Sequence, residues 1–121
     1  MFPTVSYSVT ANRFAPFADY VDIEGYDFTG ATCKLQVRDH KNGGTLRADV
    51  VPVVSVTVTE GIPTSRVSWS IDEATMEAMP LDSGDPDADV TLHHDLHLTP
   101  SGGTKFVPFA GSFVVKAGVT E

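Results

Sequence analysis

The chain has 121 residues, of which 41% are hydrophobic and 20% charged, with a single cysteine. This length and composition predict one globular domain and exclude a disordered chain, and no apolar run approaches the roughly 20 residues of a membrane helix. The formal net charge of −8 argues against nucleic acids and anionic membranes as partners, because both repel an acidic surface that carries no basic stripe.

Residues 1–19 form an apolar opening in which Pro3 and Pro16 disfavour a long central strand. We interpret its aromatic residues as candidates for an interface with another protein. The alternative is a first strand that folds onto its own sandwich. On the docking hypothesis, deleting residues 1–12 leaves a folded domain that no longer assembles. The interface candidates are Phe2, Tyr7, Phe14 and Phe17.

The middle of the chain alternates between apolar and polar residues, which is typical of half-buried strands. Turn residues separate the strands, and Asn42-Gly43 is a strong hairpin signal because type I′ turns need positive φ at both central positions. Pro52 predicts a bend, and residues 60–63 predict a turn. The expected strands here are residues 20–23, 31–38, 45–51, 54–59 and 66–71.

Parity along these strands predicts which side chains point inward. Val67, Trp69 and Ile71 share one face, so the single tryptophan is expected in the core. Cys33 is expected there too, as a small hydrophobic residue, since it shares parity with its apolar neighbours on the strand. A lone cysteine also rules out an internal disulfide.

Residues 72–79 are the one helical candidate, with Asp72 as the N-cap and Pro80 as the stop. The acidic segment 82–89 follows. Its aspartates have the spacing that begins a calcium loop, but Val90 and Leu96 stand where that loop requires Gly and Glu. We therefore expect a solvated loop.

The clearest strand is residues 90–99, and residues 104–109 and 111–115 look like a final pair of strands. The whole pattern is seven or eight short strands with turn signals every ten or so residues and one short helical turn. It predicts a single all-β domain, residues 1–121, folded as an antiparallel β-sandwich of immunoglobulin-like or jelly-roll-like type.

One strand face carries His93, Asp95 and His97, a spacing at which neighbouring histidines can share a zinc ion. These residues are weak metal candidates, because a polar outer face of a half-buried strand has the same pattern. His94 has the opposite parity, which predicts a hydrogen-bonded histidine in the core or at an interface. The sequence has no Gly-x-Ser-x-Gly, His-Glu-x-x-His or phosphate-binding loop, so we expect no catalytic residues, cofactor or enzyme activity.

Several segments, taken in order, resemble the small β-sandwich structural proteins of tailed bacteriophages, a group that includes the N-terminal domain of the upper baseplate protein family. His94 stands where those domains usually have an aromatic residue before Asp-Leu. The matching segments cover roughly residues 20 to 120. They are Asp27-Phe28-Thr29-Gly30-Ala31-Thr32, residues 34–38, residues 67–71, the short helix with Met76, residues 94–98, residues 111–115 and Val119-Thr120.

The resemblance implies a non-enzymatic virion protein of the tail, baseplate or neck, which assembles with itself and docks other virion proteins. A host-surface carbohydrate-binding sandwich and a capsid decoration protein are the alternatives. The start of the chain lacks the features of a signal peptide, so we expect synthesis in the host cytoplasm and residence in the virion.

Overall fold

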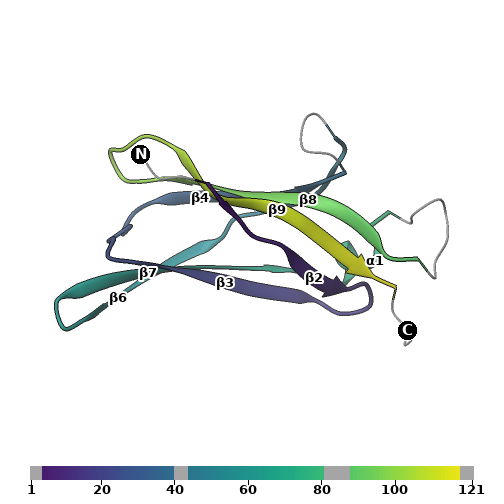
Figure 1. The fold of residues 1–121 in the computed structure, drawn as a ribbon, viewed down its shortest axis with the longest axis horizontal. Helices are drawn as coiled ribbons and strands as arrows, with labels where there is room; N and C mark the ends of the chain where they lie inside the picture. Colours follow the sequence, from purple (N-terminus) through teal and green to yellow (C-terminus); the bar gives the residue numbers. More distant parts are fainter. Residues whose placement is uncertain (1–3, 40–43, 81–87, 118–121) are drawn as a thin grey trace.

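Two β-sheets packed face to face make up the computed structural model, which describes residues 4–39, 44–80 and 88–117 (Figure 1). One short helix, α1 (Glu73–Glu77), lies at one end of the sandwich in this part of the chain. The strands are β1 (Val5–Ser6), β2 (Val9–Asn12), β3 (Phe17–Glu24), β4 (Thr32–Arg38), β5 (Leu46–Val50), β6 (Val53–Thr59), β7 (Ile62–Ile71), β8 (Val90–Thr99) and β9 (Phe106–Lys116).

The strand order identifies the type of sandwich. The larger sheet runs β1-β9-β8-β4-β5, with β2 also paired to β9, and the smaller sheet runs β3-β7-β6. Immunoglobulin-like domains divide their strands in this way, with G, F, C and C′ in one sheet and B, E and D in the other. Strands β9, β8, β4 and β5 take the first set of places, and β3, β7 and β6 take the second. The predicted all-β sandwich is confirmed, and the order is that of the immunoglobulin-like alternative.

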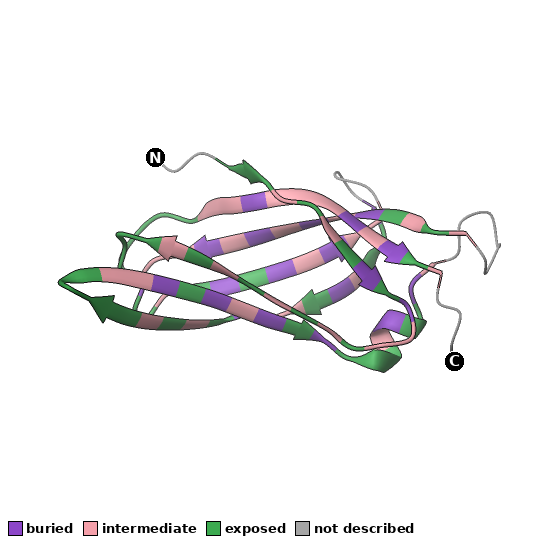
Figure 2. Ribbon diagram, turned by 60° about the horizontal axis from the view of Figure 1, so that its bottom comes forward, coloured by how far each residue is buried: buried purple, intermediate pink, exposed green. Residues whose placement is uncertain are grey.

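The core lies between the two sheets and follows the predicted alternation. Buried and less buried residues alternate along β8, and the same pattern runs through β4 and β7 (Figure 2). Trp69 and Cys33 are both buried, as their parity predicts. Because strand side chains alternate between faces, one set of positions packs inward and the other stays on the surface.

The last strand differs from the prediction. Residues 106–116 form one continuous strand, β9, where the sequence suggests two. The register between β8 and β9 shifts between Leu96 and Leu98, which pair with Phe109 and Phe106 respectively. The shift leaves Pro108 in an irregular stretch of the strand, where a residue without a backbone N–H is tolerated.

The β6–β7 hairpin is tighter than the expected turn over residues 60–63. Its turn consists of Glu60 and Gly61, both of which have positive φ, and β7 begins at Ile62. Pro63 lies within β7 opposite Val58, beyond the end of the pairing with β3. Pro63, which has no backbone N–H, therefore lies where no hydrogen bond to β3 is required from its nitrogen.

The N-terminal segment lies on the edge of the larger sheet. Strands β1 and β2 both pair with β9 in parallel, and the short break between them lies opposite Gly111. This arrangement matches the alternative in which the first strand folds onto its own sandwich.

Helix α1 follows β7 and closes one end of the core. Asp72 caps it by accepting a hydrogen bond from the Thr75 backbone N–H at 2.7 Å, as predicted, and Met76 is the helix residue whose side chain is buried. Residues 81–87 of the acidic segment lie outside the described residues, and so does the Asn42-Gly43 hairpin signal. No helix in the described ranges has the length and hydropathy of a membrane span.

Candidate functional site

The outer face of the larger sheet is polar and brings the candidate residues of β8 next to β4. The antiparallel register places Lys34 opposite His97, Gln36 opposite Asp95 and Arg38 opposite His93. Opposite residues on neighbouring strands lie close enough to interact directly. This face is therefore a continuous strip of charged and amide side chains.

Two shallow hollows lie on this strip and share the side chains of Gln36, Arg38 and Asp95. The larger one has a volume of about 390 Å³ and extends over β9 toward the N-terminal segment. The smaller one has a volume of about 280 Å³ and extends toward Lys34 and Lys105. Neither hollow is lined by an aromatic ring other than that of a histidine, so neither offers a stacking platform for a sugar.

The weak metal candidates do not form a cluster of ligands in the described part of the chain. His97 Nε2 lies 3.2 Å from Asp95 Oδ2, and both side chains are half-buried. His93 instead lines the larger hollow and faces Arg38 across the strands. Among the described residues, no three His, Cys, Asp or Glu side chains are placed to hold one metal ion together.

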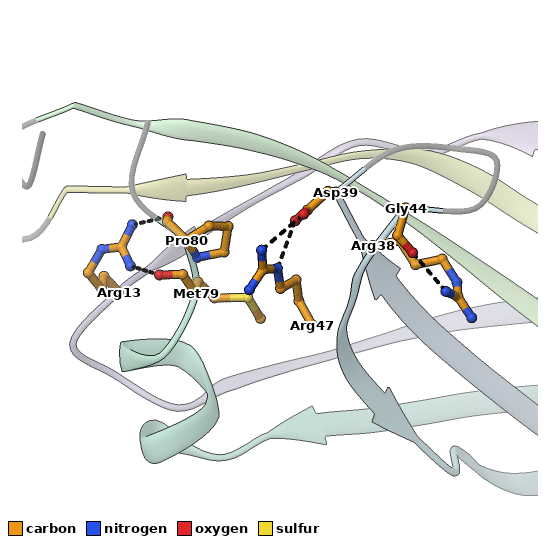
Figure 3. Close-up of polar contacts among 7 residues, drawn as sticks. All are labelled: Arg13, Arg38, Asp39, Gly44, Arg47, Met79 and Pro80. Carbon is orange, nitrogen blue, oxygen red and sulfur yellow. Dashed lines mark hydrogen bonds and ion pairs between the residues drawn. The ribbon is translucent and has the colours of Figure 1, made fainter. Parts of the chain in front are cut away.

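The arginines near one end of the sheet are already engaged (Figure 3). Arg38 donates to the Gln36 side-chain oxygen at 2.8 and 3.2 Å and to the Gly44 carbonyl at 2.9 Å. Arg47 makes a bidentate ion pair with Asp39, in which Nε and Nη2 donate to Oδ1 and Oδ2 at 2.8 and 3.0 Å. These guanidinium groups are held in fixed orientations, which suits recognition by a rigid surface.

Arg13 plays a structural part at the opposite side of the same view (Figure 3). Its guanidinium donates to the carbonyls of Met79 and Pro80 at 2.6 and 3.0 Å, and the side chain is buried. It therefore ties the end of the N-terminal segment to the chain that follows α1.

His94 points into the core, as its parity predicts, and is only 3% exposed. Its Nδ1 lies 3.0 Å from the Gly111 carbonyl, and since a carbonyl can only accept, Nδ1 carries the proton. Burial lowers the pKa of His94 below its ordinary value, and its Nε2 has no hydrogen-bond partner among the described residues. The lowered pKa favours the neutral ring, which packs against Phe109 and Phe113.

Tyr7 lies next to this histidine and joins the two sheets. Its hydroxyl donates to Asp19 Oδ2 at 2.6 Å, and its ring packs against Phe109. Burial and the hydrogen bond to Asp19 raise the pKa of Tyr7 to about 12. The residue therefore fastens the N-terminal segment to β3 across the end of the core.

The other interface candidates are distributed unevenly. Phe17 is partly buried and packs edge-on against Phe113. Phe14 lies in the segment that connects β2 to β3 and is half-buried. Phe2 lies outside the described residues. Tyr7 and Phe17 thus contribute to their own core, which leaves the docking hypothesis without an exposed aromatic surface in the described part of the segment.

The outer face of the smaller sheet carries a polar cluster that sequence reasoning missed. Arg66 pairs with Asp22 at 2.8 and 3.0 Å, and its guanidinium carbon lies 3.9 Å from the centre of the Tyr20 ring. The only signal in the sequence is that each residue has outward parity on its strand. Their contact depends on the register of β3 with β7, which no local pattern specifies.

Cys33, the single cysteine, is buried in the core. Burial raises the pKa of the Cys33 thiol, which keeps it in the unreactive neutral form. The polar groups of the outer faces pair mainly with one another.

The chain matches no protein-family model, and no curated protein matches it.

Proposed function

We propose that this chain is a non-enzymatic structural protein of a tailed bacteriophage virion, an accessory module of the tail, baseplate or neck. It assembles with itself and docks other virion proteins. The first support is the resemblance of the ordered sequence segments to small phage β-sandwich proteins. A fold by itself does not specify a function, so the surface must supply the rest of the argument.

The observation that carries the proposal is the character of the surface. The outer face of the larger sheet is broad and polar, its two described hollows are open to solvent, and Arg38 on it is held in place by Gln36. Flat, pre-ordered surfaces of this kind suit protein partners, since little side-chain entropy is lost when they bind. We assign the docking of other virion proteins to this face.

The carbohydrate-binding alternative finds less support on the same surface. Trp69 is buried, Tyr20 lies under Arg66, and Tyr26 stacks on Phe28 with ring centres 5.9 Å apart. The Trp69 ring is therefore closed to a ligand. Tyr20 and Tyr26 are 50% and 46% exposed, but each ring packs against a side chain of the protein. A capsid decoration protein would use the same kind of surface, and its position in the particle separates it from a tail module.

Mass spectrometry of purified virions tests the proposal. Particles of the phage whose genome carries this gene are banded in a density gradient, and tails are separated from heads. We expect the chain in the tail fraction in a fixed ratio to other structural proteins. Its recovery with heads favours capsid decoration, and its presence in the lysate but not in washed particles contradicts the proposal.

A further inference from the structure

Strand β6 is an unusual sheet edge. It pairs with β7 on one side, and no strand of the described chain pairs with its other side. Its seven residues, Val53–Thr59, include no charge, proline or glycine. Edge strands with free backbone donors and acceptors can pair with another chain, and proteins usually protect them with charges, prolines, bulges or short length.

The other sheet edges carry such protection. Strand β3 contains Asp19, Asp22 and Glu24, and β5 contains Arg47 and Asp49. The remaining edge is divided between β1 and β2, which have two and four residues. Strand β6 alone, among the sheet edges of the described residues, is both long and uncharged.

Apolar side chains accompany this free edge. Val58 is 62% exposed and Val53 is 65% exposed, although both lie in a regular strand. Val54 packs against the core, and Val56 and Val58 share its parity. These three valines therefore form a row on the inward-facing side of β6, and the row ends at the exposed Val58.

We propose that β6 pairs with β6 of a second copy of this chain, antiparallel and about a two-fold axis. The inference rests on the self-assembly included in the proposed function and names the surface that performs it. The two three-stranded sheets then become one six-stranded sheet. Because the two-fold axis is perpendicular to the sheet, the inward faces of both copies lie on the same side of the six-stranded sheet. The core of each copy therefore remains covered by its own larger sheet.

The register follows from the strand itself. Antiparallel neighbours on one face must have matching parity, and only a pairing centred on Val56 joins all seven residues. In that register Val56 faces its own counterpart, and Val54 faces Val58 of the second copy. Ser55 faces Thr57 of the second copy on the outer side. The strand is thus self-complementary in both apolar and polar positions.

Charge favours a second copy as the occupant of this edge. The chain carries a net charge of −8, so contacts between two copies must avoid bringing acidic groups together. At the β6 edge no charge lies on the pairing strand, and Arg66 on the adjacent strand is neutralised by Asp22. The contact is only about 24 Å long, so we expect weak pairing with a Kd on the order of 10–100 μM in free solution.

The test is sedimentation equilibrium of the full chain from about 10 μM to 1 mM. The wild-type mass should rise from 12.9 kDa toward twice that value with increasing concentration. Val58→Lys should weaken the dimer at least tenfold, because the lysine is placed beside Val54 of the second copy. Val5→Lys is the matched control, since Val5 is 59% exposed and lies on the other sheet.

A cysteine pair tests the register. Val56→Cys should form a disulfide-linked dimer under mild oxidation, because opposite residues of an antiparallel pair have Cα atoms within disulfide range. Thr57→Cys should not, since the two copies of residue 57 are offset along the strands. The native Cys33 is buried in the core and does not interfere.

The remaining outcomes overturn the inference. A wild-type monomer at every concentration contradicts it, whereas the presence of the chain in virions is decided separately. A dimer that survives Val58→Lys but is lost in Val5→Lys assigns self-assembly to the N-terminal segment instead. Equal effects of both lysine variants also contradict the inference, because the added charge or another surface would then account for them.

Discussion

At the scale of single residues, His94 is the buried group with the clearest consequence. It occupies a core position on β8, yet its Nε2 finds no partner in the described part of the chain, while Nδ1 is bonded to the Gly111 carbonyl. A protonated ring would place an unpaired charge among Phe109 and Phe113. The fold therefore favours the neutral form of this histidine.

We expect this histidine to make stability depend on pH. The folded-state pKa of His94 lies below its unfolded value near 6.5, so the unfolded chain binds more protons between the two pKa values. Stability is therefore fully present above pH 6.5 and falls as the pH drops below it, by up to about 1.4 kcal/mol per pH unit. Urea unfolding at a series of pH values measures this slope.

The variant His94→Asn isolates the effect, because the asparagine amide can still donate to the Gly111 carbonyl but does not titrate. Its stability should fall less steeply than that of the wild type between pH 6.5 and about pH 4.5. Below that range both proteins lose stability, since hydrogen bonds lower the pKa values of Asp22, Asp72 and Asp89. An unchanged slope in His94→Asn would contradict the assignment.

Gly111 is the second residue whose replacement has a specific structural consequence. A Cβ atom on Gly111 would lie 2.1 Å from the Tyr7 carbonyl oxygen, which is a backbone atom and cannot rotate away. Gly111→Ala should therefore push the N-terminal segment off β9 and lower stability by at least about 2 kcal/mol. Trypsin reports the displacement directly, because Arg13 is buried in the intact protein.

Gly25→Ala is the control for this prediction. Gly25 has a φ of +89° and open space around it, so alanine there costs only backbone strain of about 1–2 kcal/mol. We expect early cleavage after Arg13 in Gly111→Ala and not in Gly25→Ala. Equal protection of Arg13 in both variants would mean that the segment adapts without leaving β9.

At the scale of elements, the N-terminal segment has a structural role that its composition conceals. Strands β1 and β2 cover the edge of β9, and Ala11 and Arg13 are buried. Tyr7 links the segment to Asp19 on the opposite sheet. The segment thus pairs with the edge strand β9 and also contributes side chains to the core.

Deleting residues 1–12 should therefore destabilise the domain, because it uncovers β9 and leaves Asp19 without the Tyr7 hydroxyl. We expect a loss of at least about 3 kcal/mol in the free energy of unfolding. Thermal unfolding and the oligomeric state are measured on the same preparations. An unchanged Tm combined with loss of assembly supports instead the docking role that the aromatic composition suggests.

At the scale of the whole molecule, the two sheets divide the surface into different kinds of contact. The larger sheet presents a polar face on which Gln36 holds Arg38, and we propose that this face docks other virion proteins. The smaller sheet ends in the uncharged edge of β6, which we assign to a second copy. These surfaces lie on different sheets, so one copy can engage both kinds of partner, and several weak contacts in a particle add to one strong attachment.

Much of the fold was predictable because the alternation of apolar and polar residues is local. The inward positions of Cys33, Trp69 and His94 follow from parity, and the Asp72 cap follows from side-chain chemistry. The same local logic fails at Pro63, which lies inside β7 and not in the expected turn, and at residue 110, where the expected break between two strands is absent. The pairing of β7 with β3 ends before Pro63, and β9 pairs with β8 on both sides of residue 110; neither fact can be read from the local sequence.

The sequence by itself determined that this protein is a sandwich of short strands, which faces turn inward, and where its one described helix begins. Only the tertiary structure decided which strands are neighbours. It placed β1 and β2 on β9, joined Arg66 to Asp22, separated His93 from a metal-binding arrangement and left β6 at an edge. The physical reason is that strand pairing unites residues far apart in the chain, and its free energy comes from contacts that no local segment contains.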